Sequence, residues 1–395
     1  MCPVSRTRKR RFFAFPSLAR PANDESIYGG GLMRISTGVR LVIFVAAIGS
    51  TTVAANFISQ DKKGKTPQTA SLFPKDGPKI PLGLVPILWP DDNAYTPEKA
   101  ELGWLLFFDP RLSSDSTVSC ASCHAPAFAF ADGQPVSTGI KGHKGGRSAP
   151  SVINRGYGAL QFWDGRAASL EVQAKGPIAN TIEMTNEKDA AKAHATCLER
   201  LRSVKEYRQL FKKVFGVEDF TIDQVAQAIA TFERCVLSGN SPYDKFKAGD
   251  KSALTESQQR GFSIFFSNNA RCDSCHDGSA LTTNQFANIG IGMDKPSPDW
   301  GRFNVTKRED DKGAFKTPGL REIARTGPYM HDGSLKTLED VVEHYDKGGI
   351  KNQWLHQDIR PLKLSKQDKT DLVAFLHALN GEGWQQFKAP VAFPK

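Results

Sequence analysis

The chain has 395 residues, of which 39% are hydrophobic and 24% are charged, and its formal net charge at pH 7 is +10. This is an ordinary balance for a globular protein, and the length predicts two domains with additional segments. Residues 1–55 hold eight Lys/Arg and two Asp/Glu, which leaves residues 56–395 with a net charge of +4. The basic balance therefore lies mostly in the N-terminal segment and does not predict a nucleic-acid partner.

The N-terminal segment has the pattern of an export signal. Two arginines precede an apolar run at residues 41–48, and small residues follow as far as Ala55. This pattern predicts a secretory signal that starts at Met33 and is cleaved near Ala55, with residues 1–32 as an upstream extension. The alternative is an uncleaved membrane anchor, although the run is short for a span. We therefore expect a periplasmic protein with no stable membrane span in its mature form.

The rest of the chain is predicted to be mainly α-helical. Residues 56–95 are rich in Pro, Lys and Gly, which predicts an extended linker or arm. Two similar helical domains joined by loop-rich connections are expected after it, at residues 96–247 and 248–395. Five helices are predicted to begin at a Ser or Thr cap, namely Thr96, Thr221, Thr255, Thr337 and Ser365.

An internal echo supports this division into two similar halves. Glu98 is followed five residues later by Gly103, then by a Phe pair. Glu256 is followed in the same way by Gly261 and a second Phe pair. Each copy then leads into a Cys-x-x-Cys-His motif, so the two segments are predicted to have the same local structure. The helix that starts at Thr221 is expected to be broken by Ser241-Pro242.

The two Cys-x-x-Cys-His motifs are the strongest functional signal in the sequence. They occupy residues 120–124 and 272–276. Each is typical of c-type haem attachment, in which Cys120 and Cys123, or Cys272 and Cys275, form thioethers to the haem. His124 and His276 are then the iron ligands on one side of each haem. The two domains at residues 96–247 and 248–395 are therefore expected to be cytochrome c-like, each wrapping one covalently attached haem. A zinc site or a thioredoxin-like pair is the alternative, but neither explains two distant copies that each end in His.

Cys197 and Cys235 remain once the haem cysteines and Cys2 of the leader are set aside. An oxidising compartment permits a disulfide between them. Two separate buried thiols are an equally good interpretation.

The chain resembles the bacterial dihaem cytochrome c peroxidase family, which includes MauG, over roughly residues 85–385. Besides the two haem motifs, the resemblance is carried by residues 106–110, 147–151, 162–166 and 327–333. It implies two haem c groups and a peroxide-reactive first haem at His124. Glu183 and Gln173 match the family's distal residues, and Glu183 would move a proton between the two oxygens of peroxide. Trp163 matches the residue between the haems, and Asp164 and Arg166 are expected to fix its turn and the haem propionates.

The second haem is expected to take Tyr345 as its other iron ligand. The resemblance matches Tyr345 to the position that is Tyr in MauG and Met in peroxidases with a high-potential second haem. Periodicity agrees, because residues 338, 341, 342 and 345 fall on one helical face while His344 lies about 100° away. A core Tyr, or ligation by Met293 or His344, are the alternatives. An anionic oxygen ligand would favour ferric over ferrous iron.

Some positions depart from the family pattern. A loop His that binds the first iron in many dihaem peroxidases is matched by Ile140, and His143 nearby could substitute. The first haem is more simply expected to have an open site, with His143 on the surface. The surface Trp of MauG is matched by Ala270. A calcium site is implied at Thr326 and Pro328 through backbone carbonyls, with Ser148 in place of the usual Asn.

The resemblance implies an oxidoreductase that reduces hydrogen peroxide to water. Its electrons would come from a small periplasmic donor, either a cytochrome c or a cupredoxin, and the oxidising equivalents would be shared between the haems. One alternative is a MauG-like enzyme that oxidises residues of a partner protein. The other is a non-catalytic dihaem electron-transfer cytochrome.

Overall fold

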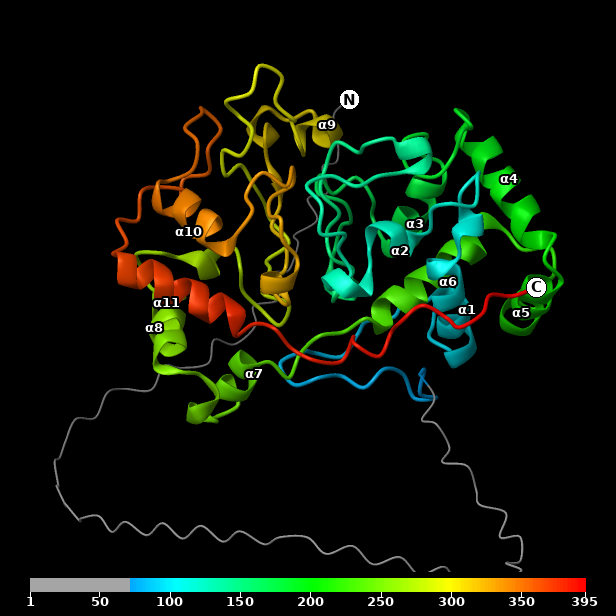
Figure 1. Ribbon diagram of the computed structural model, residues 1–395, viewed down its shortest axis with the longest axis horizontal. Coiled ribbons are helices and arrows are strands. Elements are labelled where there is room, and N and C mark those ends of the chain that lie inside the picture. The colour runs from blue at the N-terminus through cyan, green and yellow to red at the C-terminus, as the bar shows by residue number, and fades with distance from the viewer. Residues whose placement is uncertain (1–71) are drawn as a thin grey trace, which may run out of the picture. The chain divides into compact units, whose positions relative to one another are not determined.

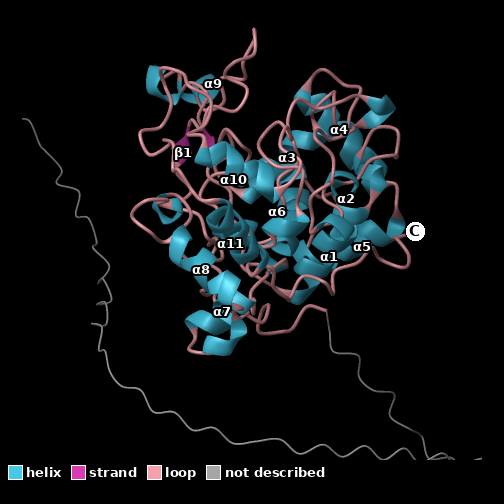
Figure 2. Ribbon diagram, turned by 60° about the vertical axis from the view of Figure 1, so that its left-hand side comes forward, coloured by secondary structure: helices cyan, strands magenta, loops and turns pink. Residues whose placement is uncertain are grey.

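Helices account for nearly all the regular structure of the described chain, which is residues 72–395 of a computed structural model (Figure 1, Figure 2). The two strands, β1 (Phe286–Ala287) and β2 (Phe315–Lys316), pair antiparallel with Phe286 opposite Lys316. The mainly helical class is thus confirmed. The helices are α1 (Pro97–Phe108), α2 (Cys120–Cys123), α3 (Leu170–Ile178), α4 (Ala190–Arg202), α5 (Lys205–Phe215), α6 (Ile222–Cys235), α7 (Pro242–Lys247), α8 (Glu256–Phe265), α9 (Phe303–Thr306), α10 (Leu338–Asp346) and α11 (Lys366–His377).

The predicted helix starts are confirmed at all five caps. Each capping side chain accepts a hydrogen bond from the backbone N–H three residues on, which satisfies a donor that the helix itself leaves free. The expectation at Ser241 needs correction. Ser241 does not interrupt a helix, because α6 has already ended at Cys235, and its side chain instead caps the new helix α7.

The echoed glycines lie where two helices cross at close range. A Cβ on Gly103 of α1 would lie 1.8 Å from the carbonyl oxygen of Ala228 in α6. A Cβ on Gly261 of α8 would lie 1.9 Å from the carbonyl oxygen of Asp371 in α11. A Cβ would clash with backbone at either place, so each half needs Gly at its own helix crossing, α1 with α6 and α8 with α11. The sequence echo therefore has a packing cause.

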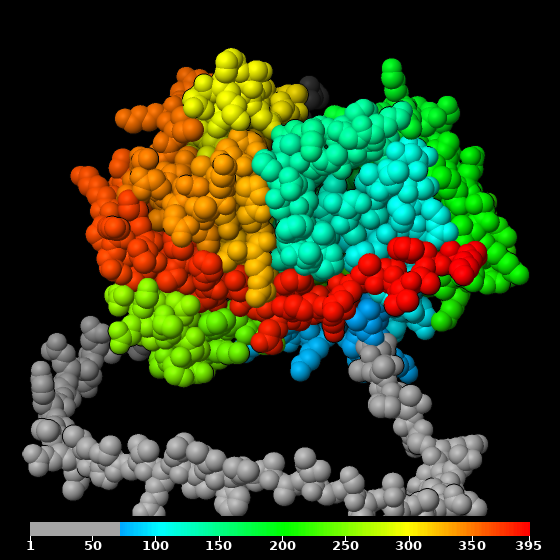
Figure 3. Space-filling view, viewed as in Figure 1, coloured from blue at the N-terminus to red at the C-terminus, as the bar shows by residue number. Residues whose placement is uncertain are grey.

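The hydrophobic core of the described residues consists of two clusters. The first draws on α1, α3, α4, α5 and α6, and the second on α8, α10 and α11. The last residues of the chain belong to the first cluster, because Trp384 and Phe387 are buried in it and Phe393 packs against it. Figure 3 shows this C-terminal segment in red, running from the second half across to the first. A domain boundary near residue 247 stays a prediction.

The first described residues form an arm without a helix or strand between residues 72 and 95. Leu82 and Asn240 exchange hydrogen bonds of 2.8 and 2.9 Å. Arg321 donates to the carbonyl oxygen of Gly83 at 3.1 Å, and the Tyr157 hydroxyl donates to that of Val85 at 2.7 Å. The arm is thus tied to residues from both halves.

The predicted signal segment and residues 56–71 of the predicted linker lie outside the described residues. Within residues 72–395, no helix has the length and apolar character that a bilayer crossing requires.

Candidate functional site

The two Cys-x-x-Cys-His motifs fold into similar short turns. Residues 120–123 form α2, which begins with a reciprocal cap between Ser119 and Ser122. The second motif begins with a single 3-10 turn, Cys272–Ser274. The four cysteines of these motifs form no disulfide within residues 72–395. Both turns therefore leave two thiols and the next His on one short stretch of backbone.

The two histidines are held in the same way. His124 Nδ1 lies 3.3 Å from the carbonyl oxygen of Phe130, and His276 Nδ1 lies 3.3 Å from that of Leu281. With the proton assigned to Nδ1, each ring donates to its carbonyl and leaves the Nε2 lone pair free. This is the orientation in which a protein presents imidazole to a metal.

Burial keeps both imidazoles neutral. It lowers the pKa of His276 to about 4, and it lowers the pKa of His124 as well. Neutral imidazole is the form that binds iron. Burial also raises the pKa of the Cys272 thiol to about 12 and that of the Cys120 thiol above its ordinary value. Both sites therefore offer the groups that a covalently attached haem requires.

A cavity of about 270 Å³ opens beside the second motif. Cys272, Cys275 and His276 line it together with Tyr345 from α10. The remaining wall is largely apolar and includes Phe265, Leu320, Leu338, Val341, Val342, Leu372 and Leu376. Two thiols, an imidazole and an apolar wall fit a haem held at this motif.

The side chain of Tyr345 is brought to the second motif and that of His344 is not. His344 Nε2 donates to the carbonyl oxygen of Ile289 at 3.0 Å, so this ring is already engaged elsewhere. Met293 does not line the cavity, and its sulfur packs near Gly313. Burial raises the pKa of Tyr345. The predicted inward face of α10 is confirmed in the described structure, while ligation by Tyr345 stays a prediction.

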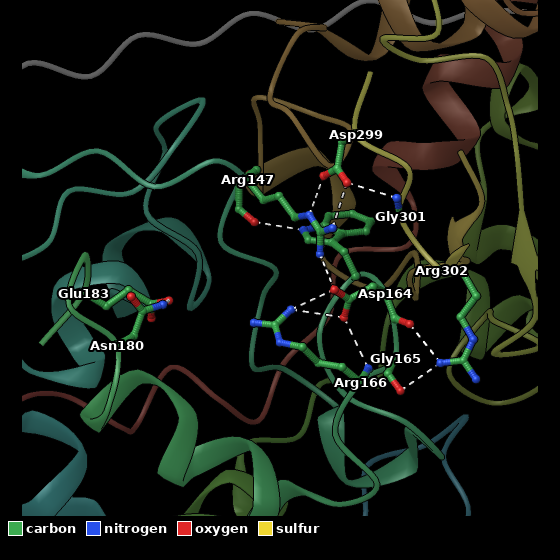
Figure 4. Close-up of polar contacts among 11 residues, drawn as sticks. Arg147, Asp164, Gly165, Arg166, Asn180, Glu183, Asp299, Gly301 and Arg302 are labelled. Atoms are coloured by element: carbon green, nitrogen blue, oxygen red, sulfur yellow. Dashed lines mark hydrogen bonds and ion pairs between the residues drawn. The ribbon is translucent and has the colours of Figure 1, made fainter. Parts of the chain in front are cut away.

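Glu183 lies beside the first motif. Its charge contributes to raising the pKa of the Cys123 thiol to about 11, which is mainly an effect of burial. Burial also raises the pKa of Glu183 itself, against the opposing charge of Arg166 and a 2.6 Å hydrogen bond from Asn180 Nδ2. Figure 4 shows Asn180 next to Glu183, and it shows the Arg166 guanidinium on the side of the Asp164 group that faces Glu183. A partly buried carboxyl group with a raised pKa is suited to hold and release a proton.

Trp163 lies in a tight loop closed by the pairing of Gln161 with Ala167. Its indole N–H donates to the carbonyl oxygen of Ser148 at 2.8 Å, and its own carbonyl accepts from Lys316 N at 2.8 Å. The ring lines the cavity of the second motif. Trp163 is thus fixed at both its side chain and its backbone.

Gln173 lies on α3, one turn after the capping residue Ser169. Its side chain is partly buried. Its distal role stays a prediction.

A cluster of charged side chains surrounds Asp164 and Gly165, the two residues that follow Trp163 (Figure 4). Asp164 accepts from Arg147 at 2.7 Å and from Arg166 at 3.0 Å, and it also accepts from the backbone N–H of Arg166. Arg147 donates in addition to Asp299, and Arg302 donates to the carbonyl oxygens of Asp164 and Gly165. The turn-fixing role expected for Asp164 and Arg166 is visible in these bonds, and their contact with the haem propionates stays a prediction. No pattern in the sequence indicated that Asp299 and Arg302 would contact the Trp163 loop.

His143 is exposed on a loop that packs on the Glu183 turn. Its Nδ1 lies 3.4 Å from the carbonyl oxygen of Thr181, whereas Ile140 is fully buried. The backbone N–H of Ile140 donates to the carbonyl oxygen of Glu183 at 3.0 Å. A role for His143 as iron ligand stays a prediction.

The three residues of the implied calcium site, Ser148, Thr326 and Pro328, line the same cavity. The carbonyl oxygen of Ser148 already accepts from Trp163. Among residues 72–395, no group of three or more His, Cys, Asp or Glu side chains is arranged to hold a metal ion. The calcium site stays a prediction, and it would depend on carbonyl oxygens.

Two further observations concern buried groups near the first motif. Cys197 and Cys235 are separate buried thiols, and Cys235 donates to the carbonyl oxygen of Thr231. Glu233 on α6 is buried, and its Oε2 has no hydrogen-bond partner within residues 72–395. Burial raises the pKa of Glu233 to about 8, and its charge would act on the Cys120 thiol. The apolar periodicity of α6 gave no indication of this carboxyl group.

Comparison with known proteins gives consistent matches. The family model described as di-haem cytochrome c peroxidase matches residues 97–252. The chain is 41% identical over 296 residues to the methylamine utilization protein MauG of Methylorubrum extorquens, which covers 74% of this chain and 81% of the relative. It is 38% identical over 307 residues to cytochrome c551 peroxidase of Nitrosomonas europaea, with coverage of 76% and 86%.

A solved structure is also similar over most of its length. It is a MauG-like protein associated with microbial copper homeostasis, with a TM-score of 0.73 and 34% sequence identity. The match covers 79% of this chain and 98% of that protein.

Proposed function

Because this chain belongs to the dihaem cytochrome c peroxidase and MauG family, we propose that it reduces hydrogen peroxide to water in the periplasm. Electrons would come from a small redox protein such as a cytochrome c or a cupredoxin. The observation that carries this proposal is the partly buried carboxyl group of Glu183, which is held by Asn180 and acts on Cys123 of the first Cys-x-x-Cys-His motif. Export is supported by the signal-like segment, because c-type haem attachment takes place outside the bacterial cytoplasm.

The first motif is the proposed peroxide site. A haem iron held at His124 supplies the redox centre for the reaction. Reduction of hydrogen peroxide to two waters consumes two electrons and two protons. In this proposal Glu183 would take the proton of the inner oxygen and return it to the outer one, so that water can leave. Asn180 fixes the carboxyl group by its 2.6 Å hydrogen bond, and Arg166 limits how far burial raises its pKa.

The second motif is the proposed electron-transfer site, with His276 and Tyr345 as iron ligands. Their shared cavity supports this assignment. Trp163 belongs to the half that carries the first motif, and it lines the cavity of the second motif. Its ring is therefore the proposed path for an electron between the two sites. The bond from its indole N–H to Ser148 holds the ring, and the bond from Lys316 N holds its backbone carbonyl.

A MauG-like activity on a partner protein is the second candidate. Tyr345 favours it, since an oxygen-anion ligand stabilises oxidised iron and suits a site that stores oxidising equivalents. The 41% identity to the Methylorubrum extorquens protein supports it too. Ala270, at the position of the surface Trp of MauG, argues for a different substrate or a different exit route.

The deciding experiment is a spectrum of the resting ferric protein before and after one equivalent of hydrogen peroxide, followed by turnover with reduced cytochrome c. A rapid spectral change and sustained turnover are expected for the peroxidase. A rapid change with slow turnover would favour the modification of a protein substrate. Two six-coordinate irons that do not react with peroxide would contradict both and leave an electron carrier.

A further inference from the structure

Two cationic side chains meet beside Trp163 without a carboxylate. Arg155 Nη2 donates to the carbonyl oxygen of Leu160 at 3.1 Å, and Lys316 Nζ donates to the same oxygen at 3.0 Å. Arg155 also donates to the neutral side-chain oxygen of Gln161. Within residues 72–395, neither cation has an ion-pair partner within 4.0 Å. Two positive charges are therefore close neighbours around one carbonyl group.

This arrangement differs from the other buried cations of the described chain. Arg321 pairs with Asp244 at 2.7 Å, and Arg234 pairs with Glu171 at 2.6 Å. Lys316 is equally buried, at 6% exposure, but its ammonium group contacts only a carbonyl. Burying a charge without a counter-ion is costly, and two adjacent like charges raise that cost. The pair needs an anion that the polypeptide around it does not provide.

The nearest acidic side chains do not serve as that anion. Asp164 already accepts hydrogen bonds from Arg147 and Arg166. Glu233 has a pKa raised by burial to about 8, so it is mostly protonated at neutral pH. Burial, followed by the charge of Arg155, lowers the pKa of Lys316 to about 6. Burial likewise lowers the pKa of Arg155 to about 10. Both shifts agree with a cation site that lacks its anion.

Both cations line the cavity that also holds Cys272, Cys275, His276 and Tyr345. A ligand attached at these two cysteines would lie in this cavity. A haem carries two propionate carboxylates, and each needs a cation or water when it is buried. The residues that attach the cofactor and the residues that lack an anion thus share one space.

We infer that Arg155 and Lys316 bind one carboxylate, a propionate of the haem attached at Cys272 and Cys275. This inference rests on the dihaem cofactor of the family and not on peroxide reduction itself. The bound pair would stabilise ferrous over ferric iron and raise the reduction potential of the second haem. Because Lys316 N donates to the carbonyl oxygen of Trp163, the same residue links this propionate to the proposed electron path.

The test compares Lys316→Met with Lys366→Met in the protein with both haems attached. Lys366 is exposed at the start of α11 and is a matched loss of one lysine. The measurement is the midpoint potential of each haem, followed by optical titration from about pH 5 to about pH 8. Lys316→Met is expected to lower the potential of the second haem and to make it depend on pH, because the propionate loses its cation. Lys316→Arg should stay close to wild type.

Arg155→Gln provides a second variant in case Lys316→Met fails to fold. It keeps a donor for the carbonyl oxygen of Leu160 while removing the charge, and it should lower the same potential. If the potential and its pH dependence in both variants match those of Lys366→Met, the inference is overturned. If the wild-type potential changes with added phosphate or acetate and this response is lost in Lys316→Met, the site binds an anion from solution and the propionate assignment is wrong. None of these readings depends on peroxide turnover.

Discussion

Arg147 binds Asp299 through two hydrogen bonds, 2.7 Å from Nε to Oδ2 and 3.0 Å from Nη2 to Oδ1. The third nitrogen of the same guanidinium donates to Asp164, which directly follows Trp163. One arginine therefore connects a loop of the second half to the loop that carries the proposed electron relay. Because the fork of a guanidinium fixes direction as well as distance, the orientation of Trp163 depends on a residue 136 positions away in the sequence.

Replacing Asp299 with Asn should destabilise the protein by about 1–3 kcal/mol, the usual cost of losing hydrogen bonds to a charged group. Burial alone would raise the pKa of Asp299, but the hydrogen bonds from Arg147 and Gly301 lower it overall. The Asp299 carboxylate therefore adds to the unfolding free energy of the wild type above the unfolded pKa of Asp. This contribution disappears as the pH falls through the lowered folded pKa. Denaturant unfolding of wild type and Asp299→Asn at several pH values measures this difference.

The control for that experiment is Asp310→Asn, an exposed carboxylate on a neighbouring loop. It should leave the unfolding free energy within experimental error. Equal stability of Asp299→Asn and Asp310→Asn at neutral pH would show that the contact of Arg147 with Asp299 contributes nothing measurable.

Replacing Glu183 with Gln should slow the reaction with hydrogen peroxide by about 100- to 10,000-fold, the range for loss of a general acid–base group. Haem content should stay intact, because Glu183 does not touch the attachment residues through any hydrogen bond of the described chain. Stopped-flow spectra of the ferric protein mixed with peroxide give the rate. Glu187→Gln is the control, since Glu187 is paired with Lys192 at the surface. A wild-type rate in Glu183→Gln would remove the proposed proton role.

Replacing Tyr345 with Phe should change the optical and EPR spectra of the second haem. The ring volume is kept and only the oxygen is lost, so a change reports the iron ligand and not packing. His344→Gln is the neighbouring control, because His344 contacts the carbonyl oxygen of Ile289 instead of the cavity. Unaltered spectra in Tyr345→Phe would place the second ligand elsewhere.

Replacing Glu233 with Gln should remove a pH dependence of stability. The folded pKa of about 8 lies above the ordinary value of 4.5, so the folded state holds a proton that the unfolded state has lost between these values. The unfolding free energy of the wild type is therefore expected to fall as the pH rises from about 4.5 to about 8 and then to level off. Glu233→Gln should flatten this segment of the curve. Identical curves would mean that Glu233 finds a partner in the mature protein.

The local features of this fold could be predicted from the sequence and the distant contacts could not. Caps such as Thr255 with Gln258 act within one turn, so the order of residues determines them. The inward face of α10 followed from periodicity for the same reason. Helices α3, α4 and α5 were not predicted individually, because α3 contains Pro177 and α4 has little apolar patterning outside Ala193, Cys197 and Leu201.

The candidate site shows the same limit. The two haem motifs are contiguous and were recognisable at once, and the resemblance supplied Glu183 and Trp163. Asp299 and Lys316 could not be found in this way, since each becomes part of the site only by meeting residues about 150 positions earlier, a separation that no sequence window covers. Gly103 and Gly261 form an intermediate case. Their repeat was visible, but its cause is a helix crossing.

The C-terminal segment has a consequence for how the polypeptide matures. Trp384 and Phe387 complete the core around α1 and α6, yet they are made only after the helices α7 to α11 that follow these two in the chain. We expect the N-terminal half to stay incompletely packed until residues 384–393 have been made, so that its motif remains accessible to the attachment machinery. Removing residues 384–395 should therefore harm the half that is made first.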